Sequence, residues 1–250
     1  MNRATTTALT LTLGFLACTT ALAKTTLIIH CGTLIAIPGQ PPKQTQSILV
    51  INDKIVSITD GYTDPDQVQT DDDTVELIDL SNHFVLPGLI DCHTHLTGEI
   101  KPAAERMRSR MQESEAHSAI DAVANAKKTV EAGFTTVRNV GSPGSVGLAL
   151  RDRINAGVVP GPRMFVSGPP VSVTGGHGDP TNSLSPILRP DLPDHQIAVD
   201  GPSEARKAVR ARIREGVDLI KITATGGVLS PTAAGLDQQF FDDELESIVE

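Results

Sequence analysis

The sequence predicts an α/β protein in which a parallel sheet carries crossover helices, preceded by a short β-rich segment. From residue 83 onward, apolar runs of strand length alternate with amphipathic runs of helix length. Before residue 60, four short β-rich runs follow one another without a helical pattern between them. The change of pattern near residue 83 predicts a boundary between two structural segments.

The β-rich segment contains four expected strands. They are Thr25–His30, Thr33–Ile37, Ser47–Ile51 and Lys54–Ile58. The pair Asn52-Asp53, between the last two runs, is a tight-turn signal that predicts a hairpin.

The α/β part begins with a strand that ends at His95. The elements expected after it are a helix within residues 103–132, a strand at Thr135–Val140, a helix at Ser145–Asn155, a strand at Arg163–Ser167, a helix at Ser203–Glu215 and a fourth strand at Leu219–Thr223. Long loops follow the third and fourth strands, at Gly168–Pro202 and Thr225–Gln239. Loops of this length in a compact domain are usually functional or disordered, so we expect binding residues in them.

Two histidines, His93 and His95, end the first strand at a spacing of two. Side chains alternate between the faces of a strand, so both imidazoles project from the same face. Two neutral imidazoles at a strand end form half of a site for a divalent metal ion. For this motif alone, a chance pair on a solvated turn is the alternative. Cys92, between Asp91 and His93, is expected to point to the opposite face and to pack in the core.

Lys221 lies at the centre of the fourth expected strand. Lysine is seldom fully buried without a partner, so an inward Lys221 indicates a function, whereas at an edge position its ammonium group would reach water. Burial lowers the pKa of a lysine, and a neutral Lys221 is able to react with carbon dioxide. The resulting carbamate is an anion that bridges two metal ions. A strand-central lysine together with the His-x-His motif therefore predicts a metal centre.

Four segments carry a family resemblance. They are Leu86–His95, Gly133–Gly141, Thr174–Asp179 and Asp218–Val228. In these segments the chain resembles the amidohydrolase superfamily, and within it the imidazolonepropionase-like and prolidase-like members. Asn139 departs from the pattern, because many relatives carry an aspartate at this position.

The resemblance implies a fold and a domain organisation. Residues 83–250 are expected to form a partial (β/α)8 TIM-like barrel of about four βα units, and residues 24–82 the small β-sandwich segment that precedes such a barrel. A closed barrel needs eight units, so we expect this chain to be the N-terminal half of a longer protein and to be inactive as a fragment.

The resemblance also implies a chemistry. His93, His95 and a carbamylated Lys221 are expected to bind one or two zinc ions, with other divalent metals as alternatives. The catalytic aspartate of the family is expected beyond Glu250, so no catalytic residue is assigned. The expected reaction is hydrolysis of an amide or peptide-like C–N bond in a small molecule, such as an Xaa-Pro dipeptide or an N-acyl amino acid.

The loop after the third strand contains the motif Thr174-Gly-Gly-His-Gly-Asp179. In βα barrels, loops at this end of the strands build the active site, and glycines let the backbone approach a ligand closely. His177 is therefore a candidate for binding the substrate. A turn histidine without a role is the alternative.

Two other function classes stay open on the sequence alone. One is a metal-binding or scaffold fragment without catalysis, since half of the family's ligand set has no matching position here. The other is a barrel enzyme that uses Lys221 as a Schiff-base amine, a scheme in which the His-x-His motif has no purpose.

Composition restricts the partners. The net charge of −9 disfavours nucleic acid and anionic membranes. Tryptophan is absent and tyrosine occurs once, so a stacking platform for bases cannot be assembled. The sequence does not indicate an oligomeric state.

The N-terminus predicts an export signal at residues 1–23. A basic start at Asn2-Arg3 precedes an apolar core and the small-x-small cleavage site Ala21-Leu22-Ala23. The apolar core is too short to span a membrane. We therefore expect a periplasmic or secreted protein, with lipoprotein processing at Cys18 as the alternative.

Overall fold

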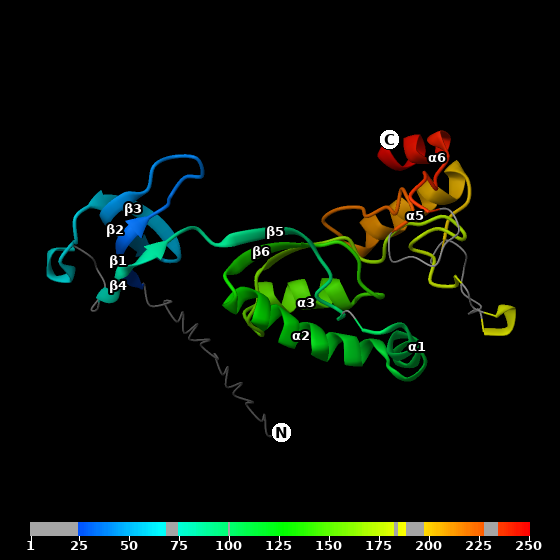
Figure 1. Cartoon of the computed structure of the whole chain (residues 1–250), viewed down its shortest axis with the longest axis horizontal. Coiled ribbons are helices and arrows are strands. Elements are labelled where there is room, and N and C mark those ends of the chain that lie inside the picture. Colours follow the sequence, from blue (N-terminus) through cyan, green and yellow to red (C-terminus); the bar gives the residue numbers. More distant parts are fainter. Residues whose placement is uncertain (1–24, 69–74, 100, 183–184, 189–197, 228–234) are drawn as a thin grey trace, which may run out of the picture. The chain divides into compact units, whose positions relative to one another are not determined.

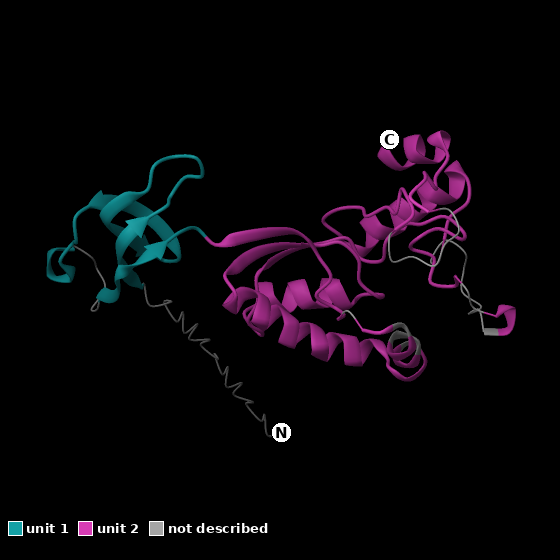
Figure 2. Cartoon of the chain, viewed as in Figure 1, with its two compact units in different colours: residues 1–87 teal, residues 88–250 magenta. Residues whose placement is uncertain are grey.

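The computed structural model describes residues 25–68, 75–99, 101–182, 185–188, 198–227 and 235–250. The expected signal peptide lies outside these residues. The chain divides into two compact units, residues 1–87 and 88–250 (Figure 2). None of the helices described is long and apolar enough to cross a membrane.

The first unit is a four-stranded sheet with the order β3-β2-β1-β4. Its strands are β1 (Thr26–Leu34), β2 (Lys43–Ile51), β3 (Lys54–Asp60) and β4 (Val75–Val85), and a short 3-10 turn, η1, spans Pro65–Gln67. The first two expected strands form one continuous β1, which pairs antiparallel with β2 and parallel with β4. Asn52 and Asp53 both have positive φ angles, 49° and 63°, as a two-residue hairpin turn requires.

The buried core of the first unit includes Cys31, Leu34 and Ile48. The strand β4 had no counterpart among the expected strands, and it pairs with β1 in a unit that ends at Pro87. The domain boundary expected at residue 82 stays a prediction. The strands described here form one sheet, so the β-sandwich stays a prediction.

The second unit is built on a parallel three-stranded sheet with the order β5-β6-β7 (Figure 1). Its strands are β5 (Leu89–Thr94), β6 (Phe134–Asn139) and β7 (Arg163–Val166). Its helices are α1 (Ala103–Gln112), α2 (Glu115–Glu131), α3 (Val146–Asn155), α5 (Pro202–Glu215) and α6 (Asp242–Val249), with a 3-10 turn, η2, at Pro186–Leu188. A parallel sheet with crossover helices confirms the expected α/β class. Closure into a barrel stays a prediction.

The core of this unit lies where α2 and α3 pack on the sheet. Ala122 and Ala126, one turn apart on α2, are fully buried, and their small side chains let the helix approach β6 closely. They meet Val137 of β6 and Met164 of β7. A second cluster joins α5 and α6 to the chain after β7. Its buried members are Val171, Val173, Val199, Ala205, Ala208 and Phe240.

The single helix expected within residues 103–132 is two helices. The chain leaves helical geometry at Glu113 and Ser114, and α2 starts afresh from a capping box. Its reciprocal bonds link Ser114 and His117, with the Ser114 amide donating to His117 Nδ1 at 3.1 Å.

The fourth expected strand, at residues 219–223, is also corrected. This segment makes one isolated parallel bridge, Ile222 to Val171, instead of a continuous ladder. The reason lies in β7, which ends at Val166 and then turns at Gly168, whose φ is +63°. Pairing with the neighbouring segment resumes only at Val171, so the described residues of this unit form three regular strands rather than the four expected.

Cys92 also differs from expectation. It is exposed rather than packed in the core, and the helices α2 and α3 pack on the neighbouring strands β6 and β7. Cys31 and Cys92 are both free thiols.

The core assignment gives a stability prediction. Met164→Ala should lower the free energy of unfolding by about 2–5 kcal/mol, because it opens a cavity beside buried Val137. Met111→Ala is the matched control: Met111 is 73% exposed, and its replacement should change stability by less than about 0.5 kcal/mol. Urea unfolding of both variants measures the difference, and equal losses would contradict this core.

Candidate active site

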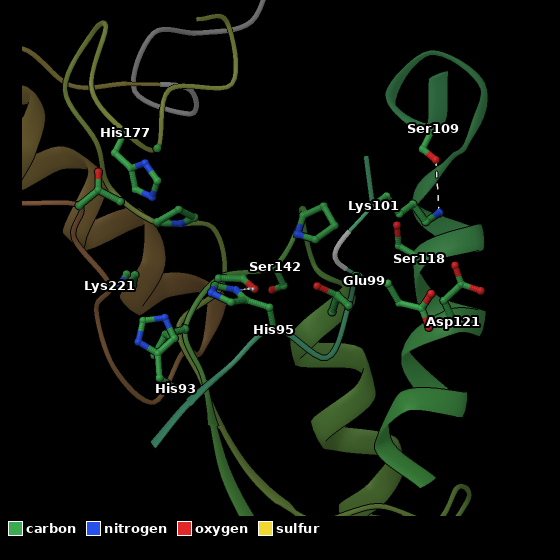
Figure 3. A pocket seen from close by; sticks show the side chains of 18 of the residues that line it. His93, His95, Glu99, Lys101, Ser109, Ser118, Asp121, Ser142, His177 and Lys221 are labelled. Carbon is green, nitrogen blue, oxygen red and sulfur yellow. Dashed lines mark hydrogen bonds between the residues drawn. The ribbon is translucent and has the colours of Figure 1, made fainter. Parts of the chain in front are cut away.

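Four predicted site residues line one cavity of about 560 Å³ (Figure 3). His93 is on β5, His95 follows the strand, His177 lies in the loop after β7, and Lys221 lies in the segment bridged to Val171. The structure thus brings together residues that are up to 128 positions apart (221 − 93). Their roles as ligands or as substrate contacts stay predictions.

The two histidines of the His-x-His motif form a close pair. Their ring centroids are 5.3 Å apart and the ring planes meet at 64°. The backbone N–H of His93 donates to Asp91 Oδ1 at 2.9 Å, which fixes the strand end from which both rings project. The same-face arrangement expected from strand periodicity is present.

The pKa of His93 is lowered. Partial desolvation of the exposed ring is the main cause, and the positive charges of Lys221, His95 and Arg138 act in the same direction, while Asp91 opposes them. The neutral imidazole is therefore favoured, and only the neutral form has a lone pair for a metal ion. The effect of Lys221 also indicates that its amine lies within electrostatic reach of the histidine pair.

His95 rests against the end of β6. Its Nδ1 faces the carbonyl oxygen of Gly141 at 3.4 Å. A Cβ at residue 141 would lie 3.3 Å from His95 Cε1, and Gly141 has a φ of +143°. Both observations explain why glycine occupies this position.

The loop that carries His177 is organised by the buried carboxylate of Asp179. Asp179 accepts hydrogen bonds from the Gly175 amide at 2.8 Å and from the amide and hydroxyl of Thr181 at 2.7 Å each. The His177 amide donates to Gln239 Oε1 at 2.8 Å. A Cβ at Gly227 would overlap the His177 ring, so that glycine allows the close approach. The Gly-Gly-His-Gly-Asp motif is thus a fixed loop that presents His177 to the cavity.

The segment of Lys221 is anchored at its start by Asp218. The Asp218 amide donates to Val166 O at 2.8 Å, and the Val166 amide donates to Asp218 Oδ2 at 2.9 Å. Arg151 of α3 donates to the same carboxylate oxygen at 2.9 Å and to the Gly216 carbonyl. These hydrogen bonds hold the start of the Lys221 segment beside the end of β7, where a continuous ladder of strand hydrogen bonds is absent among the described residues.

A polar wall of the cavity was missed by sequence reasoning. It is formed by Glu99, Lys101, Ser109, Glu113, Ser118 and Asp121. Lys101 Nζ donates to Ser109 Oγ at 3.3 Å and lies 3.8 Å from Glu113 Oε1. The one available signal was position, because Glu99 and Lys101 directly follow a strand whose C-terminal end carries the histidine pair.

The sequence profile described as "Amidohydrolase family" matches residues 84–250, the whole of the α/β unit. The chain belongs to the amidohydrolase family.

Named relatives agree with this assignment. The chain is 31% identical over 241 residues to ochratoxinase from Aspergillus niger, covering 91% of this chain and 48% of that protein. A crystal structure of a Xaa-Pro dipeptidase with bound methionine superposes with a TM-score of 0.80 at 38% identity, covering 90% of this chain and 53% of the other. A prolidase complexed with N-methylphosphonate-L-proline gives a TM-score of 0.73 at 29% identity, with 90% and 53% covered. This amidohydrolase chain therefore spans about half the length of these relatives.

The cavity of this amidohydrolase chain is lined by three histidines and by Lys221. Among the residues that the structure describes, no three His, Cys, Asp or Glu side chains gather closely enough to hold a metal ion. Two imidazoles alone leave a tetrahedral or larger coordination sphere unfilled. A carbamate on Lys221 would add oxygen donors to the same cavity.

The environment of His93 gives a pH prediction. An NMR titration should find its pKa below the ordinary value of 6.5, with the resonance assigned through His93→Gln. Below about pH 6.5 the unfolded chain then binds more protons at His93 than the folded chain does, so its contribution to folding stability falls on acidification. The pH dependence of stability should be shallower in His93→Gln through this window. A pKa at or above 6.5 would contradict the desolvation and charge argument.

Proposed function

We propose that this chain forms part of the active site of a metal-dependent hydrolase that cleaves amide or peptide-like C–N bonds. The observation that carries the proposal is the convergence of His93, His95 and Lys221 on one cavity in an amidohydrolase chain. The alternative of a solvated turn for the histidine pair does not explain why Lys221, from a distant segment, lines the same cavity.

His93, His95 and Lys221 would hold the ion. The lowered pKa of His93 keeps its ring neutral, and the Gly141 carbonyl beside His95 Nδ1 leaves Nε2 of that ring as a donor atom. Lys221 is proposed to carry a carbamate, which would add the anionic oxygen donors that the histidine pair lacks. When bound, zinc or another divalent ion supplies Lewis acidity that polarises a carbonyl and lowers the pKa of water.

The substrate is proposed to be a dipeptide of the Xaa-Pro type or an N-acyl amino acid. The Xaa-Pro dipeptidase and the prolidase among the relatives favour the first class. His177 is proposed to contact the substrate beside its scissile bond, because the Asp179-centred loop holds it at the cavity. The polar wall, with Lys101 and Glu113 at its centre, offers charged groups to the charged ends that such substrates carry.

Export to the periplasm or the medium remains part of the proposal. It rests on the basic, apolar and small-x-small order of residues 1–23. Fractionation of cells that express the chain, with N-terminal sequencing of the product, tests it.

Zinc binding tests the metal site. Equilibrium dialysis with bicarbonate present should show that His93→Ala or His95→Ala weakens zinc binding on the order of 100-fold, since each removes one of few donors. Lys221→Ala should weaken it as well, and mass spectrometry of the native chain should show a gain of one carbon dioxide on Lys221. His83→Ala, an exposed histidine of β4, is the control and should leave zinc affinity unchanged. Unaltered binding in the site variants would contradict the proposal.

Activity tests the reaction. The protein that contains this chain, loaded with zinc, should hydrolyse an Xaa-Pro dipeptide or an N-acetyl amino acid, and His93→Ala should abolish the hydrolysis. Borohydride trapping of a substrate adduct on Lys221 would instead support the Schiff-base reaction.

A further inference from the structure

The loop that carries His177 is held from outside as well as from within. Asp179 fixes the loop from within, and the chain just before α6 supplies the outer contact. The backbone N–H of His177 donates to Gln239 Oε1 at 2.8 Å, across 62 positions of the sequence. Gln239 does not line the cavity, so its connection to the site runs through this hydrogen bond to His177.

The amide of Gln239 uses one of its two ends. A backbone N–H is a donor only, so the side-chain atom that faces His177 must be the oxygen. The nitrogen at the other end, Nε2, is buried and has no hydrogen-bond partner among the residues that the structure describes. A buried donor without a partner lowers the stability of a folded chain. The contribution of this side chain therefore comes through its oxygen.

The backbone around Gln239 is fixed on both sides. Its N–H donates to Ala224 O at 2.8 Å, and Gln238 forms an antiparallel bridge with Thr225. On the other side, Phe240 is 2% exposed and packs in the buried cluster that joins α5 and α6 to the chain after β7. The acceptor oxygen is thus carried by a rigid segment.

The chain that follows Lys221 contacts the ring of His177. A Cβ at Gly227 would lie 2.4 Å from His177 Cε1 and 2.6 Å from its Nδ1, so the ring rests against the backbone of that glycine. The neighbouring Gly226 donates its N–H to Asp237 O at 3.3 Å. The segment after Lys221 is therefore paired with the chain before α6, and together they contact both the ring and the backbone of His177.

We propose that Gln239 is a positioning residue that holds His177 at the cavity, where His177 contacts the dipeptide substrate. This inference deepens the proposed function and rests on it for the role of His177. Because Gln239 touches neither the cavity nor the histidine pair, its loss should act on hydrolysis through His177 and leave the bound metal unchanged. The chain before α6 then supports the active site from outside the cavity.

Gln238 supplies a matched control. It is the same residue type at the neighbouring position, but its Nε2 donates to Phe240 O at 2.6 Å and to Asp242 Oδ1 at 3.0 Å. Methionine removes the amide and keeps the length of the side chain at either position. Gln238→Met therefore loses two hydrogen bonds and none to His177. Gln239→Met loses the hydrogen bond to His177 and also removes a buried, unpaired nitrogen.

The test compares both variants in the zinc-loaded protein that contains this chain. In Gln239→Met, the His177 amide should exchange its hydrogen on the order of tenfold faster, and kcat/KM for the dipeptide Ala-Pro should fall on the order of tenfold. Its urea midpoint should not fall, because removal of the unpaired nitrogen offsets the lost hydrogen bond. Gln238→Met should show the reverse, a lower urea midpoint with amide exchange and kcat/KM unchanged. Zinc content should be unchanged in both.

A double mutant isolates the route through His177. In a His177→Ala background, Gln239→Met should cause no further loss of kcat/KM, because the group that it positions is already gone. A further loss as large as that in the wild-type background would overturn the inference, and so would equal effects of the two glutamine variants on kcat/KM.

Amide exchange separates the positioning role from the proposed function. If the wild-type protein hydrolyses no dipeptide but Gln239→Met still speeds exchange of the His177 amide, the proposed function fails and the positioning contact stands. A His177 amide that exchanges in the wild type as fast as an unprotected one would overturn the inference without any variant. That measurement stays decisive if Gln239→Met fails to fold.

Discussion

The parallel pairing of β5 with β6 is the constraint on which the candidate site depends. Thr94 lies opposite Asn139, and the Val140 amide donates to Thr94 O at 3.0 Å, so both strands end at the same edge of the sheet. That edge carries the histidine pair on one strand and the Asn139–Gly141 turn on the next. A shift of one residue in this register would turn the histidines to the other face and separate them from the Gly141 carbonyl.

The position of Lys221 depends on a different kind of interaction. Regular strand pairing stops at Val166, and side-chain bonds from Asp218, reinforced by Arg151, continue the connection to the next segment. The pKa of Arg151 is raised, because its hydrogen bonds and charge pairing with Asp218 and Asp152 outweigh the cost of its burial. The hydrogen bonds and charges of Asp218 and Arg151 therefore position the Lys221 segment where regular strand pairing ends. Further along the chain, the parallel bridge between Val171 and Ile222 pairs this segment with the chain after β7.

Some of this architecture could be predicted from sequence because it follows from local periodicity. The spacing of His93 and His95 predicts both rings on one face, and the structure has their centroids 5.3 Å apart although the pairing of β5 with β6 is irregular between Asp91 and Thr94. The break between α1 and α2 could not be predicted so easily, because it depends on a capping box that begins at Ser114 and interrupts a continuous helical pattern. The part of the polar wall formed by Ser109, Glu113, Ser118 and Asp121 lies on these two helices and at the break between them.

Other errors came from interactions that periodicity does not encode. Strand β4 pairs in parallel with β1, which lies about 50 residues earlier in the sequence. Buried and exposed residues do not alternate regularly along β4. The exposure of Cys92 depends on where the helices cover the sheet, and the pattern of the strand itself does not encode that cover. The buried side chain of Asn139 makes hydrogen bonds to the backbone of residues 96 and 141, and only the folded chain brings residue 96 close to it.

The central claim is that one cation binds where His93, His95 and Lys221 converge. Anomalous diffraction at the zinc edge, from crystals of the chain soaked in zinc and bicarbonate, tests it directly. The account predicts a peak about 2.0–2.1 Å from one imidazole nitrogen of each histidine, with added density joining Lys221 Nζ to it. A peak elsewhere, or a Lys221 side chain directed away from it into solvent, would contradict the account.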